Sequence, residues 1–412
     1  MIKNIVIFAG LILLFPGLVF CQTDIQINRK LETSVFAYKN KEDHKKWYGQ
    51  AKLLVPIEVT WSDHPSFRLV ADPQLQVDSE GIASGVRSVV DERERKIVDA
   101  REVFMEYIKN KWEFSLGWQI KDWSITDTVS PSDNLNPLDL AIIPEWERKP
   151  APMASLRYGY DNFVEIAVKP FFTSPILPEF RWRSPRTPGV NILSPKEEED
   201  RFDFGVRVGG LAYRTDWQVT FYSGYADNPY GEIMGSSAPG IKVKPRYSRE
   251  QVASLGIVRN LPLLNVLGRG EIGYFHQDKG DNFIQYVVGA EKYWQNLIGA
   301  GDELFALLQF SAEDVTDKDS DIIRLSDFRR IFDDAFIGKV HYQFGQNSPW
   351  KLKLRGSWNI EDEDSFVEPA VEYKRRKWKL EVGTWLVTGP DDSFWGQYDR
   401  NDSIFSRLTV KF

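Results

Sequence analysis

The chain has 412 residues, of which 42% are hydrophobic, 14% aromatic and 27% charged, and its formal net charge is −7. This acidic balance argues against a nucleic-acid binder, whose surface would be basic. The mean hydropathy of −0.37 argues against long apolar membrane helices in the mature protein.

The N-terminus has the pattern of a secretory signal peptide. A short positive start at Met1–Asn4 precedes an apolar run over 5–20, and a polar exit follows Cys21. We predict a signal peptide over residues 1–21, with an uncleaved anchor and lipidation of Cys21 as the alternatives. Cleavage removes the only cysteine, so the mature chain would be exported without disulfides, thiolate metal ligands or a cysteine nucleophile.

Alternation of apolar and polar residues recurs along the whole mature chain. In the segment 112–121, for example, Trp112 and Trp118 share one parity, while Glu113 and Lys121 share the other. Such a period of two indicates strands with one apolar face. We place strands at 31–39, 49–61, 66–77, 98–109, 112–121, 152–160, 162–171, 202–213, 216–225, 250–259, 268–277, 282–293, 302–312, 334–344, 350–360, 366–374, 377–387 and 403–412.

The connections between these strands differ in length in a regular way. Every other connection is short, as at Asn110-Lys111, whereas the long ones include 122–151, 172–201 and 226–249. This layout predicts an all-β fold, a transmembrane antiparallel up-and-down β-barrel of about 18 strands, with 16 possible. The single domain would cover 22–412, with short periplasmic turns and long extracellular loops. The alternative is a soluble β protein with an aromatic core.

The last strand indicates which type of membrane the barrel would span. The alternating end from Ile404 to Phe412 resembles the C-terminal strand of bacterial outer-membrane β-barrels. The resemblance implies the Gram-negative outer membrane as location, contact with its lipid and lipopolysaccharide, and recognition of the Phe412 strand by the barrel-insertion machinery. In such a barrel the apolar parity faces lipid and the polar parity faces the lumen.

Charged residues of both signs occupy the parity that we expect to face the lumen. Lys351, Lys353 and Arg355 place three cations on one face of one strand, and such ladders set ion preference in pores. Glu368 and Glu372 on the next strand are in a position to neutralise them. The predicted pore-lining charges are Lys351, Lys353, Arg355, Arg157, Arg207, Glu368 and Glu372. The alternative is a solvated, mutually paired lining without selectivity.

The loop 122–151 combines polar acceptors with an apolar stretch that a solvated loop would not need. We predict that it folds into the lumen and forms the constriction of a wide barrel. A surface cap and a calcium site are the alternatives, although the spacing does not match an EF-hand. The predicted constriction residues are Asp127, Ser132, Asp133, Asn134, Asn136 and Asp139.

The same loop carries a family resemblance. Its segment TDTVSPSDNLNPLDL resembles the Asn-Pro-x-Asp-Leu loop of porin-like outer-membrane proteins, which are similar in architecture to the alginate-export channel. In the next long loop, Arg181, Arg183 and Arg186 could bind anionic sugars or carboxylates at the mouth. Contact with lipopolysaccharide phosphates, or with the acidic run 197–200, is the alternative.

These observations favour a channel over an enzyme. Only four histidines occur, His44, His64, His276 and His341, and no nucleophile motif accompanies them. We therefore expect passive diffusion of small polar or charged solutes, without a catalytic residue, metal or cofactor. Export of an acidic exopolysaccharide is the second hypothesis, and a non-conducting adhesin or structural barrel is the third. The sequence leaves the solute and the oligomeric state open.

Overall fold

The structure is a computed structural model. It describes residues 23–27, 29–42, 45–61, 66–78, 98–145, 147–178, 180–182, 190–192, 202–237, 240–320, 322–324 and 331–412. The predicted signal peptide with Cys21 lies outside these residues. Among the residues described, no helix is both long and apolar enough to span a membrane.

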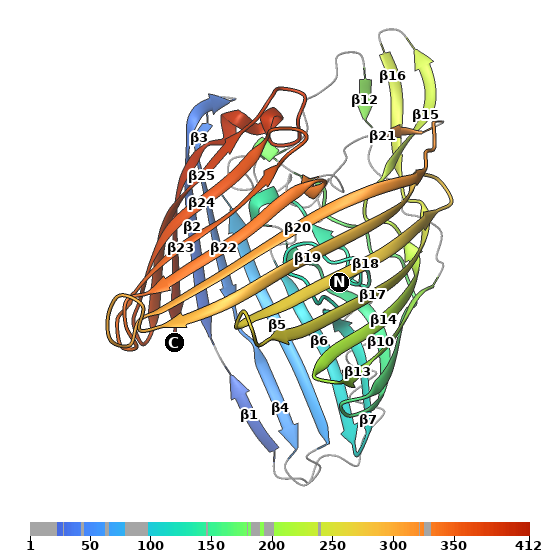
Figure 1. The fold of residues 1–412 in the computed structure, drawn as a ribbon. Helices are drawn as coiled ribbons and strands as arrows, with labels where there is room; N and C mark the ends of the chain where they lie inside the picture. Colours follow the sequence, from blue (N-terminus) through green and yellow to red (C-terminus); the bar gives the residue numbers. More distant parts are fainter. Residues whose placement is uncertain are drawn as a thin grey trace.

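The described strands form a closed antiparallel barrel of eighteen strands, counting two interrupted strands once each (Figure 1). The barrel-forming elements, in order around the wall, are β1 (Thr23–Ile27) with β2 (Lys30–Glu42), β3 (Lys45–Leu54) with β4 (Ile57–Trp61), β5 (Phe67–Asp78), β6 (Val98–Lys109), β7 (Trp112–Gln119), β10 (Ala151–Gly159), β11 (Phe163–Lys169), β13 (Asp203–Ala212), β14 (Thr215–Tyr225), β17 (Arg249–Leu261), β18 (Val266–Gln277), β19 (Asn282–Gln295), β20 (Glu303–Asp317), β22 (Ala335–Gln343), β23 (Trp350–Asn359), β24 (Ser365–Lys374), β25 (Trp378–Thr388) and β26 (Ser403–Lys411). The predicted fold class and strand number are confirmed.

The last strand closes the barrel against the first. β26 pairs with β2 in antiparallel register from Lys30↔Lys411 to Tyr38↔Ser403. The ladder continues beyond the strands, because the backbone N–H of Phe412 donates to the carbonyl of Arg29 at 3.1 Å. Closure leaves no free sheet edge along this seam, which satisfies the backbone without water.

The expected continuous strand over 49–61 is wrong, because the strand is interrupted at Val55 and Pro56. Proline has no N–H to donate to the ladder, and Pro73 on the neighbouring strand lies at a register shift after Asp72. The N–H of Val55 instead donates to the carbonyl of Pro73 at 3.1 Å. Two prolines therefore mark a local break in the wall without opening it.

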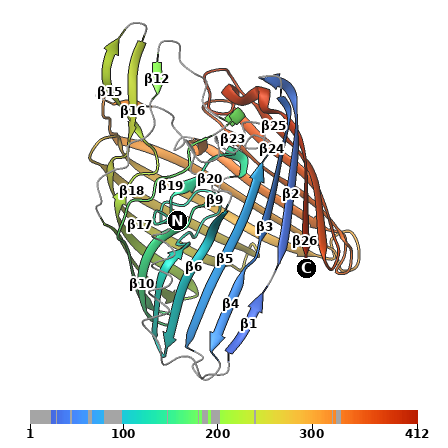
Figure 2. The same cartoon turned by 180° about the vertical axis from the view of Figure 1, so that it is seen from behind.

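The predicted loop 226–249 also contains more structure than expected. β15 (Tyr230–Ser237) and β16 (Gly240–Arg246) form a hairpin that rises from the rim (Figure 2). Together with β12 (Val190–Ile192) and β21 (Ile323–Arg324) it makes a four-stranded sheet. The short β8 (Leu138–Asp139) and β9 (Glu147–Arg148) pair with each other inside the loop 120–149.

The two faces of the wall differ in chemistry. On β23, Trp350, Leu352 and Leu354 are exposed on the outer face, whereas Ser357 and Asn359 on the other parity are buried inside. Outer aromatic side chains also contact one another across strands, as at Trp350–Tyr373 and Trp112–Tyr158. The outer band is apolar with aromatic rings near its edge, and the interior is polar.

The interior nevertheless holds two apolar clusters. One joins the wall residues Phe36, Trp385 and Phe405 to Leu140 and Ile143 of the loop. The 3-10 helices η2 (Ile143–Glu145), η3 (Phe180–Trp182) and η5 (Gly396–Asn401) supply further members. The second cluster joins Trp123 and Leu135 to the opposite side of the wall. Inward loops thus fill part of the barrel and pack against its seam.

Truncating Phe405 should weaken the barrel at its closing strand. Phe405→Ala removes ring contacts to Phe36 and Trp385, and we expect a loss of about 3 kcal/mol. Urea unfolding in detergent, followed by mobility on unheated gels, measures the change. Tyr213→Ala, at an exposed turn, serves as the control and should leave the midpoint within experimental error.

Candidate functional site

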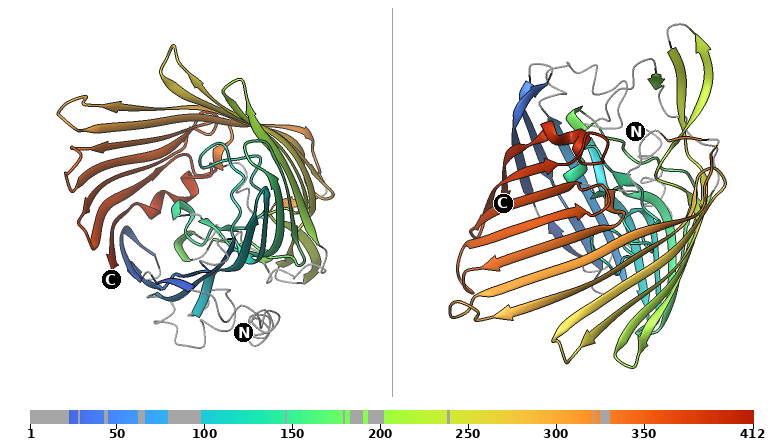
Figure 3. Two further views of the ribbon diagram at one scale, coloured as in Figure 1. Left: turned by 90° about the horizontal axis from the view of Figure 1, so that it is seen from below. Right: turned by 45° about the horizontal axis from the view of Figure 1, so that its top comes forward.

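The described residues of 120–149, that is 120–145 and 147–149, which we call the lumen segment, lie between β7 and β10 inside the barrel (Figure 3). Its two ends leave adjacent paired strands, since Gln119 is in register with Ala151. Between these ends the segment forms two arms, 122–136 and 138–148, and each arm touches a different part of the wall. The candidate functional site is formed by these two arms and the inner-wall side chains that contact them.

Asn136 holds the base of the lumen segment together. Its amide Nδ2 donates to the carbonyls of Gln119 and Lys149, and its Oδ1 accepts the N–H of Lys121 at 2.8 Å. The side chain is fully buried. An asparagine amide supplies both donors and an acceptor, so Asn136 bridges the end of β7 to the chain just before β10.

The first arm follows the wall from β14 to β22. Gln218 donates to the carbonyl of Trp123 at 2.6 Å. Glu271 accepts from the N–H of Ile125 at 3.0 Å and from the hydroxyl of Thr126. At the tip, Lys339 pairs with Asp127 at 2.6 Å. Wall side chains therefore satisfy the backbone of a segment that has few ladder partners of its own.

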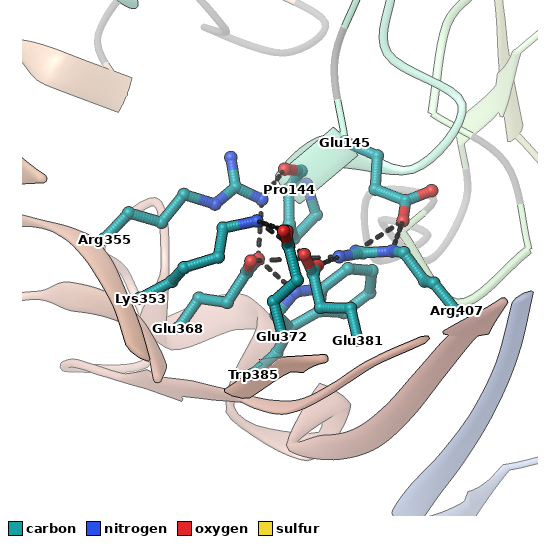
Figure 4. Close-up of polar contacts among 9 residues, drawn as sticks. All are labelled: Pro144, Glu145, Lys353, Arg355, Glu368, Glu372, Glu381, Trp385 and Arg407. Atoms are coloured by element: carbon teal, nitrogen blue, oxygen red, sulfur yellow. Dashed lines mark hydrogen bonds and ion pairs between the residues drawn. The ribbon is translucent and has the colours of Figure 1, made fainter. Parts of the chain in front are cut away.

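The second arm reaches the wall near the closing seam (Figure 4). Arg355 donates to the carbonyl of Pro144 at 2.7 Å and pairs with Glu368 at 2.6 Å. Arg407 of β26 pairs with Glu145 at 2.6 Å. The lumen segment is thus tied to strands on both sides of the interior, which restricts its movement.

The predicted pore-lining charges lie on the inner face, and most of the cations among them have acidic partners. Lys353 pairs with Glu381 at 2.5 Å and with Glu372 at 3.6 Å. Lys351 is in register with Glu372 across β23 and β24. The cation ladder on β23 therefore has a facing row of carboxylates, which reduces its net field.

A similar arrangement occurs on the opposite wall. Arg207 and Lys121 approach Glu165 at 2.7 and 3.4 Å. Arg157 is in register with Glu165 and lies over the ring of Phe163 at 4.0 Å. Positive and negative side chains again occur close together on the lining.

Most of the predicted constriction residues organise the segment itself. Ser132 accepts from Ser254 of β17 and is buried, and Asn134 donates to the carbonyl of Pro131. Asp139 accepts the N–H of Ala141. Of the six predicted residues, Asp127 forms an ion pair with a cation of the described wall, Lys339. Short polar side chains serve here as turn and backbone partners.

Of the three arginines predicted at the mouth, only Arg181 lies within the described residues. Its guanidinium donates to the Oδ1 of Asn401 at 3.2 Å and to the carbonyl of Arg400 at 2.9 Å. It also lies over the ring of Tyr38 at 4.4 Å. These contacts join η3 to η5. Arg183 and Arg186 fall outside the residues that the structure describes.

Arg148, Asp133 and Asp227 form a charged cluster that holds the second arm in place and was not predicted from the sequence. Arg148 pairs with Asp133 at 2.9 Å and approaches Asp227, between β14 and β15, at 3.5 Å. Burial, together with the negative charge of Asp133, raises the pKa of Asp227 to about 6, although Arg148 and Lys169 oppose the shift. Burial also raises the pKa of Asp133. One arginine thus serves two carboxylates.

Four residues with structural contacts in the interior were not predicted from the sequence: Trp123, Glu145, Arg148 and Asp227. They occupy aperiodic segments, where no alternation indicates which side chain points to the wall. Within the ranges that the structure describes, no group of three or more His, Cys, Asp or Glu side chains is placed to hold a metal ion.

Comparison with known proteins adds support for the fold. No protein-family model and no curated protein matches the sequence. OccK11 (OpdR) of Pseudomonas aeruginosa matches with a TM-score of 0.52 and 9% identity, over 94% of this chain and 95% of that chain. OmpT, an outer membrane protein of Vibrio cholerae, gives 0.43 at 9% identity, over 95% and 98%. OmpF of Salmonella typhi, solved with daunomycin, gives 0.44 at 8%, also over 95% and 98%.

At such low identity, the OccK11 likeness bears on the fold alone. It agrees with the eighteen-stranded antiparallel barrel that the pairing registers define. The structure thus defines an eighteen-stranded antiparallel β-barrel with an apolar outer face and a charged interior that an inward segment crosses.

Displacing the first arm should widen the lumen. A Cβ on Gly205 of β13 would lie 2.8 Å from the ring of Trp123, so Gly205→Val should push Trp123 off the wall. We expect faster proteolysis within 120–149 while the barrel stays folded. Gly270→Val is the matched control, because its Cβ would meet only ordinary contacts from 3.7 Å. Equal proteolysis of the two variants would contradict this packing role.

The raised pKa of Asp227 predicts a pH dependence. The native state holds the carboxyl proton of Asp227 more tightly than the unfolded chain, in which the pKa of this carboxyl is near 3.8. Native stability should therefore rise as pH falls through the window from about 6 to 3.8. Urea midpoints at pH 4 and 7 measure the effect, which Asp227→Asn should reduce. Asp161→Asn, at an exposed turn, should retain the wild-type difference.

Proposed function

We propose that the chain is an outer-membrane channel for passive diffusion of small polar or charged solutes, with the lumen segment as its constriction. The observation that carries the proposal is the inward segment 120–149, bound to the wall on both sides of a charged interior. A wide barrel without such a segment would be an open aqueous hole. No chemical step is required, so solutes are selected by width and charge.

The outer face supports placement in a bilayer. A closed sheet with its apolar parity outward satisfies its backbone inside hydrocarbon. Contacting aromatic rings such as Trp350 and Tyr373 are suited to the membrane interface. Export through the predicted signal peptide and an outer-membrane location follow as parts of the same proposal.

The pairing of lining charges favours weak ion selectivity. Lys353, Arg355 and Arg207 each have a carboxylate partner within 2.7 Å. Paired charges of opposite sign largely cancel each other at a distance in a wet pore. This arrangement gives no support to a strongly basic path for a polyanion, so diffusion of small solutes is preferred to export of an acidic polysaccharide.

Conductance in planar bilayers tests the proposal. The wild-type barrel should open discrete channels with a small reversal potential in a salt gradient. Lys351→Glu, Lys353→Glu and Arg355→Glu together leave the facing carboxylates unneutralised, so the reversal potential should move toward cation preference.

The control reverses the same number of charges outside the barrel wall, at Arg375, Arg376 and Lys377 in an exposed turn. That variant should change the reversal potential much less. A reconstituted barrel that never conducts would overturn the channel proposal, and an equal shift in both variants would overturn the pore-lining role of the β23 cations.

A further inference from the structure

Three neighbouring short turns expose large apolar side chains at one part of the rim. The residues are Leu263 and Leu264 between β17 and β18, Leu297 and Ile298 between β19 and β20, and Phe344 after β22. Leu263 is 100% exposed, Ile298 79% and Leu264 64%. We call these five residues the apolar rim. Such a patch on a protein surface usually marks an interaction site.

The apolar rim lies on the turns of adjacent strands, and these turns are held by side-chain hydrogen bonds. The strands that carry it are consecutive neighbours in the wall. Lys292 donates to the carbonyl of Leu264 at 3.0 Å, and the hydroxyl of Tyr342 donates to Asp302 at 2.8 Å. These two contacts join the first turn to β19 and the second turn to β22.

Asp302 fixes the middle turn. Its carboxylate accepts the backbone N–H groups of Leu297, Ile298 and Gly299 at 2.7 to 2.8 Å. The buried carboxylate therefore satisfies the backbone of the turn from within. The two apolar side chains at its tip stay outside, and their exposure does not result from a poorly bonded loop.

The rim continues the outer aromatic band of the barrel. Trp294, on the outer parity of β19, precedes Ile298 by four residues, and Phe344 packs edge-on against Tyr342 at 4.9 Å. At roughly 3.4 Å per residue these tips lie within about 14 Å of the aromatic level. Such rings occupy the headgroup level of a bilayer, so the tips lie within reach of its headgroup and acyl boundary.

A neighbouring turn provides the contrast. Between β24 and β25, the outer aromatic residues Tyr373 and Trp378 contact each other at 5.3 Å. Here the turn between them consists of Arg375, Arg376 and Lys377, all exposed. Beyond the outer aromatic residues, the turn between β24 and β25 thus carries cations, whereas the turns of the apolar rim carry leucine, isoleucine and phenylalanine.

We propose that the apolar rim is a lipid-binding surface, inserted into the interface of the bilayer that surrounds the barrel. This inference rests on the proposed membrane function and adds that the barrel is seated asymmetrically, with one arc of short turns in lipid and the next arc in water. Side chains such as leucine and isoleucine gain free energy by leaving water for this boundary.

Depth-dependent fluorescence quenching tests the inference. The mature barrel without residues 1–21 has no native cysteine, so a single cysteine introduced at 263, 298, 352 or 376 can carry a small fluorophore. The full mature barrel is reconstituted in phosphatidylcholine vesicles with nitroxide on the lipid chain or with iodide in the water. Labels at 263 and 298 should be quenched by lipid at least twofold more than the label at 376.

Position 352, on the outer apolar face of β23, separates this inference from the proposed function. If 352 is quenched by lipid while 263 and 298 respond only to iodide, the lipid-binding rim is overturned and the membrane barrel stands. If 352 also fails to respond to lipid, placement in a bilayer is overturned, and the rim inference with it. All four positions are exposed, so labelling should not prevent folding.

Discussion

Closure of the sheet by the ladder between β2 and β26 is the constraint on which the remaining structure depends. Once Lys30 to Tyr38 pair with Ser403 to Lys411, each strand of the wall has two neighbours and the interior is separated from the exterior. The alternation of side chains then places one parity outside and the other inside along the described strands of the wall. Everything that distinguishes the two environments follows from this separation.

The closed wall creates a space that its own lining does not fill. The chain fills part of it with segments that lack regular alternation, above all the lumen segment. Apolar side chains such as Leu140 and Ile143 pack at the closing seam, while Trp123 and Leu135 pack on the other side. The contacts that hold these segments therefore also support the wall, and an aromatic cluster of Phe36, Trp385 and Phe405 packs behind the seam.

Electrostatics of the interior depend on the same geometry. The antiparallel register brings Arg355 opposite Glu368 and Lys351 opposite Glu372, so each inner cation on β23 has a carboxylate within reach. The carboxylate of Glu368 is buried while Arg355 is 35% exposed, and a buried charge left without its partner is costly. These pairs therefore belong to the structure as well as to the lining. The arms of the lumen segment join this network through Glu145 and Asp127.

The sequence by itself determined the strands and their two faces, because a period of two can be read along each strand without knowing how the strands pair. It also predicted that the loop 122–151 folds inward, since a long aperiodic stretch with apolar content needs a partner. Tertiary structure alone decided the roles within that segment. The pattern predicts Asn136 and Asp139 as constriction residues, yet Asn136 bonds to backbone groups of Lys121 and Lys149, and Asp139 to the N–H of Ala141. Arg148 and Asp227 meet although 79 residues separate them. Outside regular strands, side-chain direction depends on contacts between distant parts of the chain, which alternation does not encode.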